Sequence, residues 1–380
     1  MYSFCAFAGV EFKPIWSVEG NTTDGKATIY KTSVPAGLHF LELFNSSTSA
    51  RYVPAREPNG NVELDQNNYA SRAASWLPAV AFGTATLVTN GSYIDTHGQN
   101  ISINRGGMFD QYAVGVGGPA NNFDPAVSYW AQAKPRGGGA STYTIPSGMV
   151  IGKPSSAQAP QLALGGKDGF VFMMHTHAWG SWVYEIASTA TARGAAAGGG
   201  TTVKFGEGGF QEARGTGSPT AGGGSFYLSH RKEFLDVAGE WYLDSASNTL
   251  SLAVAAGTQP PAGLIAPVVQ QLFALEGSQA APVTHVRLSA LTFKHAAPTY
   301  MEKSAVGSGG DYSLFRGGVV HLNGTENCTV DHSLFDAIGG NGIFLTDYNR
   351  HALITANEMR HIGENGVAMR GSTDWVDGEN

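Results

Sequence analysis

A 24-residue repeat near the end of the chain constrains the fold more than any other feature of its sequence. Residues 338–342 (IGGNG) recur as residues 362–366 (IGENG), and Val330 is followed at the same spacing by Ile354. Short apolar runs that recur about every 20 to 25 residues and are broken by Gly and Asn indicate a solenoid with one coil per repeat. Leucine-rich repeats have a similar period, but the Leu-x-x-Leu-x-Leu frame is absent here. The repeat therefore predicts stacked coils of short β-strands.

One coil consists of three short apolar runs, GIFLTD, ALITA and EMRHIG, with Asn357 at a tight corner where Asn adopts left-handed backbone at low cost. Because successive side chains in a strand point to opposite faces, the coil should have an inner and an outer set. The expected inner residues are Val320, Leu322, Ile343, Leu345, Val367 and Met369. The expected outer residues are His321, Asn323, Phe344, Thr346, Ala368 and Arg370. Alignment of residues 320–324 (VHLNG) with residues 344–347 (FLTD) requires one extra residue in the following turn.

The sequence divides into two regions that differ in how regularly their apolar runs are spaced. Residues 1–265 contain irregular β-like runs between Gly-rich loops, including a predicted hairpin, EWYLDSASNTLSLAV, whereas residues 266–380 are periodic. An earlier coil fits residues 272–278 and 286–293, followed by a long loop before Gly318. The 51 glycines and a charged fraction of only 14% agree with many tight turns in an all-β protein.

Charge and hydropathy exclude several classes of partner. A net charge of -7 argues against nucleic acid as a partner, and no apolar run is long enough to cross a membrane. Six N-x-S/T sequons, beginning at Asn21, Asn45, Asn90, Asn100, Asn323 and Asn327, suit a secreted glycoprotein. The first residues do not resemble a signal peptide, so either the chain is not exported or its true start is missing. With the sequons, we expect the second, and an extracellular, monomeric protein.

Residues 266–380 resemble the right-handed parallel β-helix proteins of the pectate-lyase-like superfamily. A narrower resemblance, to large secreted β-helix proteins of algae and other microbes, rests on ARYVPAREPNGN (50–61), EWYLD (240–244), FKHAAPTYME (293–302), RGGVVHLNGTEN (316–327) and GNGIFLTDYNR (340–350). Those proteins are akin to β-helix glycoside hydrolases of the fucosidase and xylanase type. The resemblance implies an all-β, right-handed parallel β-helix with an inserted β-rich region, and an oligosaccharide or polysaccharide as the partner. Such proteins usually continue through further coils, so we expect this chain to be truncated, with Val367 and Met369 under an open end.

Carboxylates at matching positions of adjacent coils would lie about 4.8 Å apart, close to the roughly 5–5.5 Å of a retaining glycosidase. Asp347 follows the strand GIFLT, and Asp374 falls in the corresponding turn one coil later. Asp311, in the long loop, is a candidate general acid. Asp at turns also commonly caps its own backbone, and a structural ion pair is the alternative for Asp311 and Arg316. The candidate catalytic residues are therefore Asp347, Asp374 and Asp311.

Several other residues are candidates for binding substrate. Arg316 would hold an anion or hydroxyl, and His321 and Arg370 point outward from the sheet. We expect Glu364 on the opposite side of a binding groove over the sheet, too far along the coil to pair with Asp347 unless loops fold over. Tyr300 and Tyr348 are suited to stacking on sugar rings. Only Arg370 suits the base of a polysaccharide lyase, and no acidic run for Ca²⁺ appears, so a hydrolase is favoured over a lyase.

The sequence gives no reason to expect a metal or another cofactor. His175 and His177 share one face of a strand, but no third ligand with suitable spacing follows, and we interpret them as a structural cluster. The favoured hypothesis is a glycoside hydrolase acting on a plant or algal polysaccharide. A non-catalytic glycan-binding or adhesive protein is the alternative, and the sugar, linkage and stereochemical outcome stay open.

Overall fold

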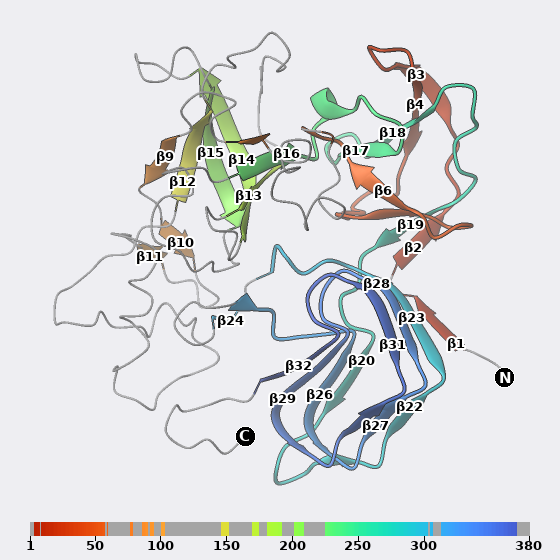
Figure 1. Ribbon diagram of the computed structural model, residues 1–380, viewed down its shortest axis with the longest axis vertical. Coiled ribbons are helices and arrows are strands. Elements are labelled where there is room, and N and C mark those ends of the chain that lie inside the picture. Colours follow the sequence, from red (N-terminus) through yellow and green to blue (C-terminus); the bar gives the residue numbers. More distant parts are fainter. Residues whose placement is uncertain are drawn as a thin grey trace.

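The computed structural model describes an all-β chain (Figure 1). The described residues are 4–7, 9–57, 59, 77–78, 86–89, 92–94, 100–102, 146–151, 169–174, 181–191, 201–208, 225–302, 305–306 and 313–370. Within these ranges the helical structure is confined to a single 3-10 turn, Lys232–Phe234. They contain no apolar helix of membrane-spanning length.

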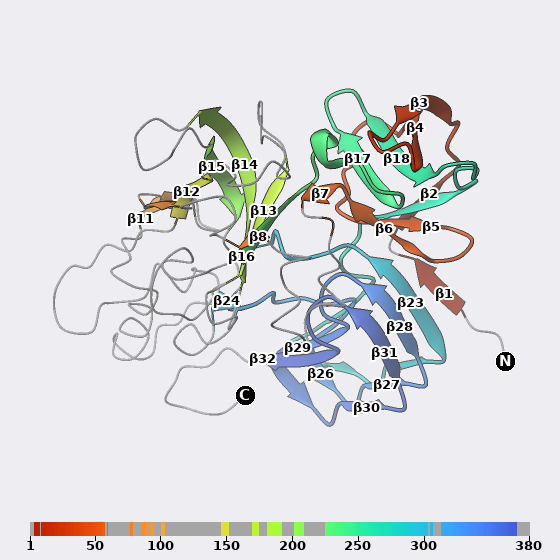
Figure 2. The same ribbon diagram turned by 45° about the horizontal axis from the view of Figure 1, so that its top comes forward.

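The C-terminal part is solenoid-like, with three sheets in which every neighbouring pair of strands is parallel (Figures 1 and 2). The first sheet contains β1 (Phe4–Phe7), β23 (Leu291–Ala296), β28 (Leu334–Ile338) and β31 (Glu358–Ile362). The second contains β20 (Phe273–Glu276), β26 (Val320–Glu326), β29 (Ile343–Arg350) and β32 (Val367–Arg370), with β21 (Val283–Thr284) also paired to β26. The third contains β22 (Arg287–Ser289), β27 (Thr329–Asp331) and β30 (Leu353–Thr355). The chain passes through the three sheets in turn, which is consistent with the predicted solenoid-like fold.

The register between coils follows the 24-residue spacing. Val330 is paired with Ile354, as the sequence predicts, and Phe335 is paired with Met359 at the same spacing. The predicted inner residues Val320, Leu322, Ile343 and Leu345 are buried in one hydrophobic cluster. Val367 and Met369 share the same row by register, and they are 40% and 74% exposed.

The backbone at the coil corners differs from expectation. Left-handed φ angles recur at positions 24 residues apart, at Asn327 and His351 and again at His332 and Ala356. At the predicted Asn corner the left-handed residue is therefore Ala356, and the prediction that Asn357 adopts this conformation is wrong. Asn357 instead bonds the coil before it: Oδ1 accepts from Ser333 N (3.0 Å), and Nδ2 donates to Val330 O (2.9 Å). An amide side chain that satisfies two backbone groups of the neighbouring coil explains why Asn is suited to this position.

The N-terminal part adds two further sheets above the solenoid in the view of Figure 1. The first runs in the order β2 (Gly9–Phe12), β19 (Leu264–Pro267), β5 (Leu43–Asn45), β6 (Arg51–Pro54), β17 (Glu240–Asp244), β18 (Thr249–Ala255), β4 (Ala27–Ser33) and β3 (Ser17–Asn21). The second runs in the order β7 (Arg56–Glu57), β16 (Ser225–Ser229), β13 (Phe170–Met174), β14 (Ser181–Thr191), β15 (Thr201–Gly208), β12 (Pro146–Ile151) and β9 (Thr86–Thr89), with β8 (Leu77–Pro78) beside β16. Two short pairs complete the described strands: β10 (Ser92–Ile94) with β11 (Asn100–Ser102), and β24 (Ala305–Val306) with β25 (Ser313–Leu314).

The N-terminal residues contribute both to the solenoid and to the sheet above it. The strand β1 extends the first parallel sheet by pairing with β23, a contribution that the sequence did not reveal. The predicted hairpin of β17 and β18 is confirmed, and Trp241 of β17 is fully buried against Phe40 in the core of the upper sheet. The first residues of the chain therefore belong partly to the solenoid and partly to the sheet above it.

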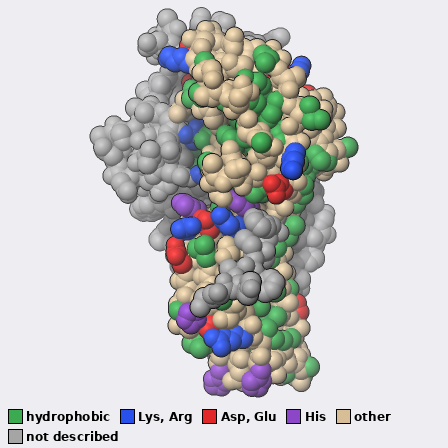
Figure 3. Space-filling model, turned by 90° about the vertical axis from the view of Figure 1, so that its right-hand side faces the viewer, with side chains coloured by type: hydrophobic (Ala, Val, Ile, Leu, Met, Phe, Trp, Pro, Cys, Tyr) green, Lys and Arg blue, Asp and Glu red, His purple; other side chains and the backbone are tan. Residues whose placement is uncertain are grey.

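A line of charged residues crosses the outer face of the first parallel sheet. Lys294, Asp336 and Arg360 occupy one register row on β23, β28 and β31. Asp336 lies 3.4 Å from Lys294 Nζ, 3.2 Å from Arg360 Nη2 and 2.9 Å from His361 Nδ1. Figure 3 shows basic, acidic and histidine side chains gathered at mid-height of this side of the molecule. Burial by itself raises the pKa of Asp336, but the hydrogen bonds from Arg360 and His361 and the two positive charges lower it well below its ordinary value.

The pKa of Asp336 is lower in the folded protein than in the unfolded chain, so its charge should stabilise the fold at pH values above the unfolded-state pKa of about 4. This stabilisation should be lost as the pH falls through the folded-state pKa. We expect Asp336→Asn to lower the melting temperature at pH 7, with a difference from the parent that shrinks steadily below about pH 4. Glu358→Gln is the control, since this side chain is 66% exposed on the same sheet. A difference that stays constant from pH 7 to pH 2 would contradict the electrostatic explanation.

Candidate functional site

The outer face of the β20–β26–β29–β32 sheet carries the candidate site. His321 and Asn323 on β26 alternate with core residues and therefore face away from the solenoid interior. Phe344 and Thr346 occupy the matching outward positions of β29. They are nevertheless buried, at 0% and 5% exposure, so this part of the outward face is covered. The cover includes the segment 315–318, described below.

A bulge in β29 positions Asp347. Asn323 pairs with Thr346 at a spacing of 23 residues, whereas Thr325 pairs with Asn349 at a spacing of 24, so β29 contains one extra residue between them. This is the extra residue that the sequence alignment required. Asp347 lies in the bulge with a left-handed φ of 54°, inside the strand and not in a turn after it as the sequence suggested. The bulge sets Asp347 apart from the regular alternation of the strand.

Gly324, on the strand beside the bulge, approaches the neighbouring coil very closely. Its φ is +64°, and a Cβ at this position would lie 2.2 Å from the backbone carbon of Gly277. We expect Gly324→Ala to lower the free energy of unfolding by about 1–3 kcal/mol, because β20 and β26 must separate. Gly25→Ala is a matched control with a φ of +70° and no atom within 4 Å of its Cβ, so it reports backbone strain alone. Equal losses in urea denaturation of the two variants would refute the steric explanation.

Arg316 connects three groups at the edge of this face. Its Nη2 donates to Thr346 Oγ1 and to the backbone oxygen of Arg370 (3.3 Å), and it lies 3.5 Å from Asp347 Oδ1. Burial lowers the pKa of Arg316, against the opposing effect of the Asp347 carboxylate. Its Nη1 is buried and has no acceptor among the described residues. The structure thus brings Arg316, Asp347 and Arg370 together, with one guanidinium nitrogen still able to donate a hydrogen bond.

Glu276 and His321 form a second polar group beside it. Glu276 Oε1 is 3.2 Å from His321 Nδ1, and its Oε2 accepts from Asn323 Nδ2 at 3.1 Å. The His321 side chain is 13% exposed, and its buried Nε2 has no partner among the residues that the structure describes. Burial lowers the pKa of His321, while Glu276 opposes this. An uncharged ring that donates from Nδ1 to Glu276 leaves the buried Nε2 as an acceptor.

Sequence reasoning missed Glu276. It lies in residues 272–278 (LFALEGS), which were assigned to an earlier coil, and in the structure it is in register with Asn323 and Thr346. Extending the coil register by one repeat would have revealed it as an outward carboxylate. Glu276 and the Thr346–Asp347 position are separated by two strand spacings, or about 10 Å between their backbones. His321 lies on the strand between them.

Glu364 is connected to the site by the segment 315–318. Its Oε1 accepts from Phe315 N at 3.2 Å, and Oε2 is 3.5 Å from Thr299 Oγ1. Although the residue as a whole is exposed, partial burial of the carboxyl group raises its pKa. Phe315 precedes Arg316, so this segment spans from Glu364 to Asp347. The segment thus contacts both acids, through Phe315 N and Arg316 Nη2.

The two tyrosines lie in different places. Tyr348 donates from its hydroxyl to Glu326 Oε1, which raises its pKa, and Arg350 lies over its ring at 5.6 Å. Tyr300 contacts the second upper sheet, with its ring 6.4 Å from that of Phe170, and burial raises its pKa. Asp311 and Asp374, and also His175 and His177, lie outside the described residues. Among the described residues, no group of three or more His, Cys, Asp or Glu side chains could hold a metal ion.

The likeness of this chain to known proteins lies in its fold. No protein-family model matches the chain, and no curated protein does either. Among solved structures, the chain is similar to a glycoside hydrolase, with a TM-score of 0.57 and 15% sequence identity over 97% of this chain and 53% of the other. The chain thus spans about half the length of that glycoside hydrolase. At this identity the likeness shows the fold alone, which is all-β with parallel, solenoid-like sheets.

Proposed function

We propose that this protein is a glycoside hydrolase of the right-handed parallel β-helix type, acting on a plant or algal polysaccharide. The observation that carries the proposal is the pair of carboxylates, Glu276 and Asp347, on one sheet face with His321 between them. Beside this pair, Arg316 Nη1 can donate a further hydrogen bond and His321 Nε2 can accept one. Both suit a ligand with many hydroxyl groups. The glycoside hydrolase found among solved structures supports the same class by its fold.

The separation of the two acids favours inversion at the anomeric carbon. Inverting glycosidases hold their carboxyl groups about 6.5–9.5 Å apart, which leaves room for water, whereas retaining enzymes hold them about 5–5.5 Å apart. Two strand spacings give roughly 10 Å between backbones, and the Glu276 side chain, which reaches His321 on the strand between, shortens the carboxyl separation. In this proposal Asp347 takes a proton from water, the water oxygen bonds to the anomeric carbon, and Glu276 donates a proton to the departing glycosidic oxygen.

The pair expected from the sequence, Asp347 with Asp374, makes a different prediction about the product. One coil separates those positions, which corresponds to the retaining distance of about 5 Å. Asp311 is then the candidate acid from the loop. The anomeric configuration of the first product, followed by proton NMR, therefore distinguishes the two assignments.

The experiment is a screen of plant and algal polysaccharides for release of reducing ends by the purified chain. Release of reducing sugar supports the proposal, and binding without release on every substrate would favour the non-catalytic glycan-binding alternative. A polysaccharide lyase is the second enzymatic candidate, because Arg370, the residue that suits its base, lies beside Arg316, which donates to its backbone oxygen at 3.3 Å. A lyase would release products with the ultraviolet absorbance of an unsaturated uronate, and a hydrolase would not. The sequons lead us to propose secretion as well.

A further inference from the structure

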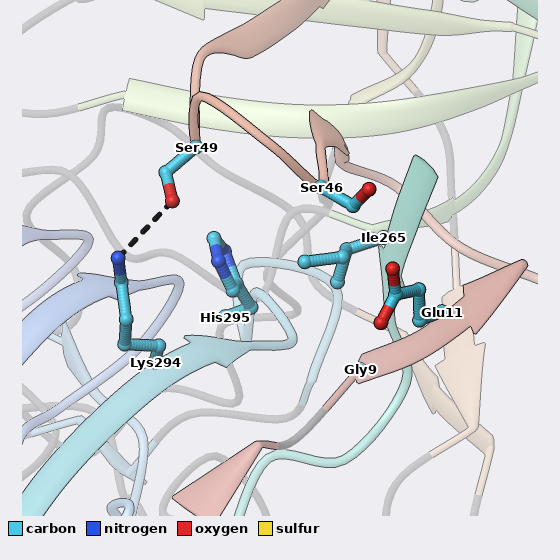
Figure 4. A pocket seen from close by; sticks show the side chains of 7 residues that line it. All are labelled: Gly9, Glu11, Ser46, Ser49, Ile265, Lys294 and His295. Atoms are coloured by element: carbon cyan, nitrogen blue, oxygen red, sulfur yellow. Dashed lines mark hydrogen bonds between the residues drawn. The ribbon is translucent and has the colours of Figure 1, made fainter. Parts of the chain in front are cut away.

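A pocket lies where the solenoid meets the first upper sheet, away from the candidate site. Its volume is about 360 Å³, within the range of about 300–1,000 Å³ that is typical of small-molecule sites. Figure 4 shows the seven lining residues: Gly9, Glu11, Ser46, Ser49, Ile265, Lys294 and His295. Lys294 and His295 come from β23 of the first parallel sheet, whereas Glu276 and Asp347 belong to the second. The pocket is thus formed by two parts of the fold that are far apart in sequence.

The charges of the lining nearly cancel. Lys294 Nζ is 3.1 Å from Ser49 Oγ and 3.4 Å from Asp336 Oδ2, so its charge is already balanced by a carboxylate. Glu11 lies on the other side of the pocket in Figure 4, with His295 and Ile265 between it and Lys294. Burial lowers the pKa of His295 to about 4, so its ring is uncharged at neutral pH. Without excess positive charge, the lining does not favour a carboxylate, sulfate or phosphate ligand.

The polar groups of the lining suit a ligand with hydroxyl groups on several sides. The hydroxyls of Ser46 and Ser49 both donate and accept, the Lys294 ammonium donates, and the Glu11 carboxylate accepts. The Ile265 side chain and the His295 ring add apolar surface in the middle of the pocket (Figure 4). An apolar ligand would cover the Glu11 carboxylate without donating a hydrogen bond to it, which is costly. A neutral sugar ring, with hydroxyls at its rim and C–H groups on its faces, matches both parts of the lining.

The lining is also held in place before any ligand arrives. A Cβ on Gly9 would lie 2.6 Å from Ile265 Cγ2, which shows how closely β2 and β19 approach here. The ring of His295 packs on that of Phe44 with centroids 4.5 Å apart. A preformed site avoids the entropy cost of ordering its side chains on binding.

We propose that this pocket binds one neutral sugar unit and serves as an accessory binding site. The ligand class follows from the lining alone, so the proposal does not rest on the catalytic roles of Asp347 and Glu276. In a protein that also cleaves glycans, such a site would hold a distant part of the same chain and raise the local concentration of substrate.

The test is isothermal titration calorimetry of the intact chain with D-glucose, D-galactose, D-xylose and L-fucose, and with D-galacturonate as the anionic comparison. We expect at least one neutral sugar to bind more tightly than the uronate. Lys294→Met and Glu11→Gln should each weaken that binding about tenfold or more, the loss expected for a charge-assisted hydrogen bond. Glu11 is an exposed residue, so Glu11→Gln should retain the fold and keeps the proposal testable if Lys294→Met does not.

Two controls locate the binding. Lys13→Met changes an exposed lysine that does not line the pocket, and Asp347→Asn changes the candidate site; both should bind the sugar as the parent does. Absence of binding by every neutral sugar would overturn the proposal, as would tighter binding of the uronate. Loss of binding in Asp347→Asn with no effect of Glu11→Gln would place the sugar at the other site and refute an accessory pocket.

Discussion

Phe335→Ala is expected to lower the free energy of unfolding by about 3–5 kcal/mol, the usual cost of truncating a fully buried aromatic residue. The Phe335 side chain is 0% exposed, and its ring stacks on that of Phe293 in the neighbouring coil with centroids 4.5 Å apart. In register, Phe293, Phe335 and Met359 form one row inside the solenoid, so the cavity would open between coils. Urea denaturation followed by circular dichroism measures the loss.

Leu353→Ala is the matched control for this substitution. Leu353 is in the third parallel sheet but is 53% exposed, so its truncation should change stability by no more than about 0.5 kcal/mol. A charged substitution in the core should have a larger effect: Leu345→Asp places a carboxylate at a position that is 6% exposed and should unfold the solenoid locally. Similar stability of Phe335→Ala and Leu353→Ala would mean that the coils do not share this core.

Asp347→Asn and Glu276→Gln should each reduce the rate of glycan cleavage by about 10²–10⁴-fold, the typical contribution of a general acid or base. Both substitutions keep the shape of the side chain and its hydrogen bonds to Arg316 or Asn323, so the melting temperature should change little. On the polysaccharide that gives activity in the screen, kcat and KM are measured for both variants. Because the acids act at the reacting bond, kcat should fall much more than KM changes.

Further variants distinguish the proposed pair from the alternatives. Glu358→Gln, on a different sheet, should leave the rate unchanged, and Asp374→Asn should be nearly as active as the parent if Glu276 is the partner of Asp347. The first product should have the inverted configuration. A retained product together with loss of activity in Asp374→Asn would remove Glu276 from the mechanism and support the pair one coil apart.

The solenoid is the part of this protein that the sequence determined by itself. Each coil packs only against its neighbours, so a 24-residue spacing of apolar residues specifies both the strands and their register. The buried Val320, Leu322 and Ile343 and the extra residue at Asp347 follow directly from that local pattern.

The candidate sites depended on contacts between distant residues, which only the tertiary structure decided. Arg316 reaches Asp347 through a loop whose path is not periodic, and Glu276 becomes its neighbour across an intervening strand. The accessory pocket combines Glu11 with Lys294, residues 283 positions apart in the sequence. A repeat encodes the spacing between equivalent positions, whereas the packing of loops and of a separate sheet against the coils is set by side-chain contacts that leave no period in the sequence.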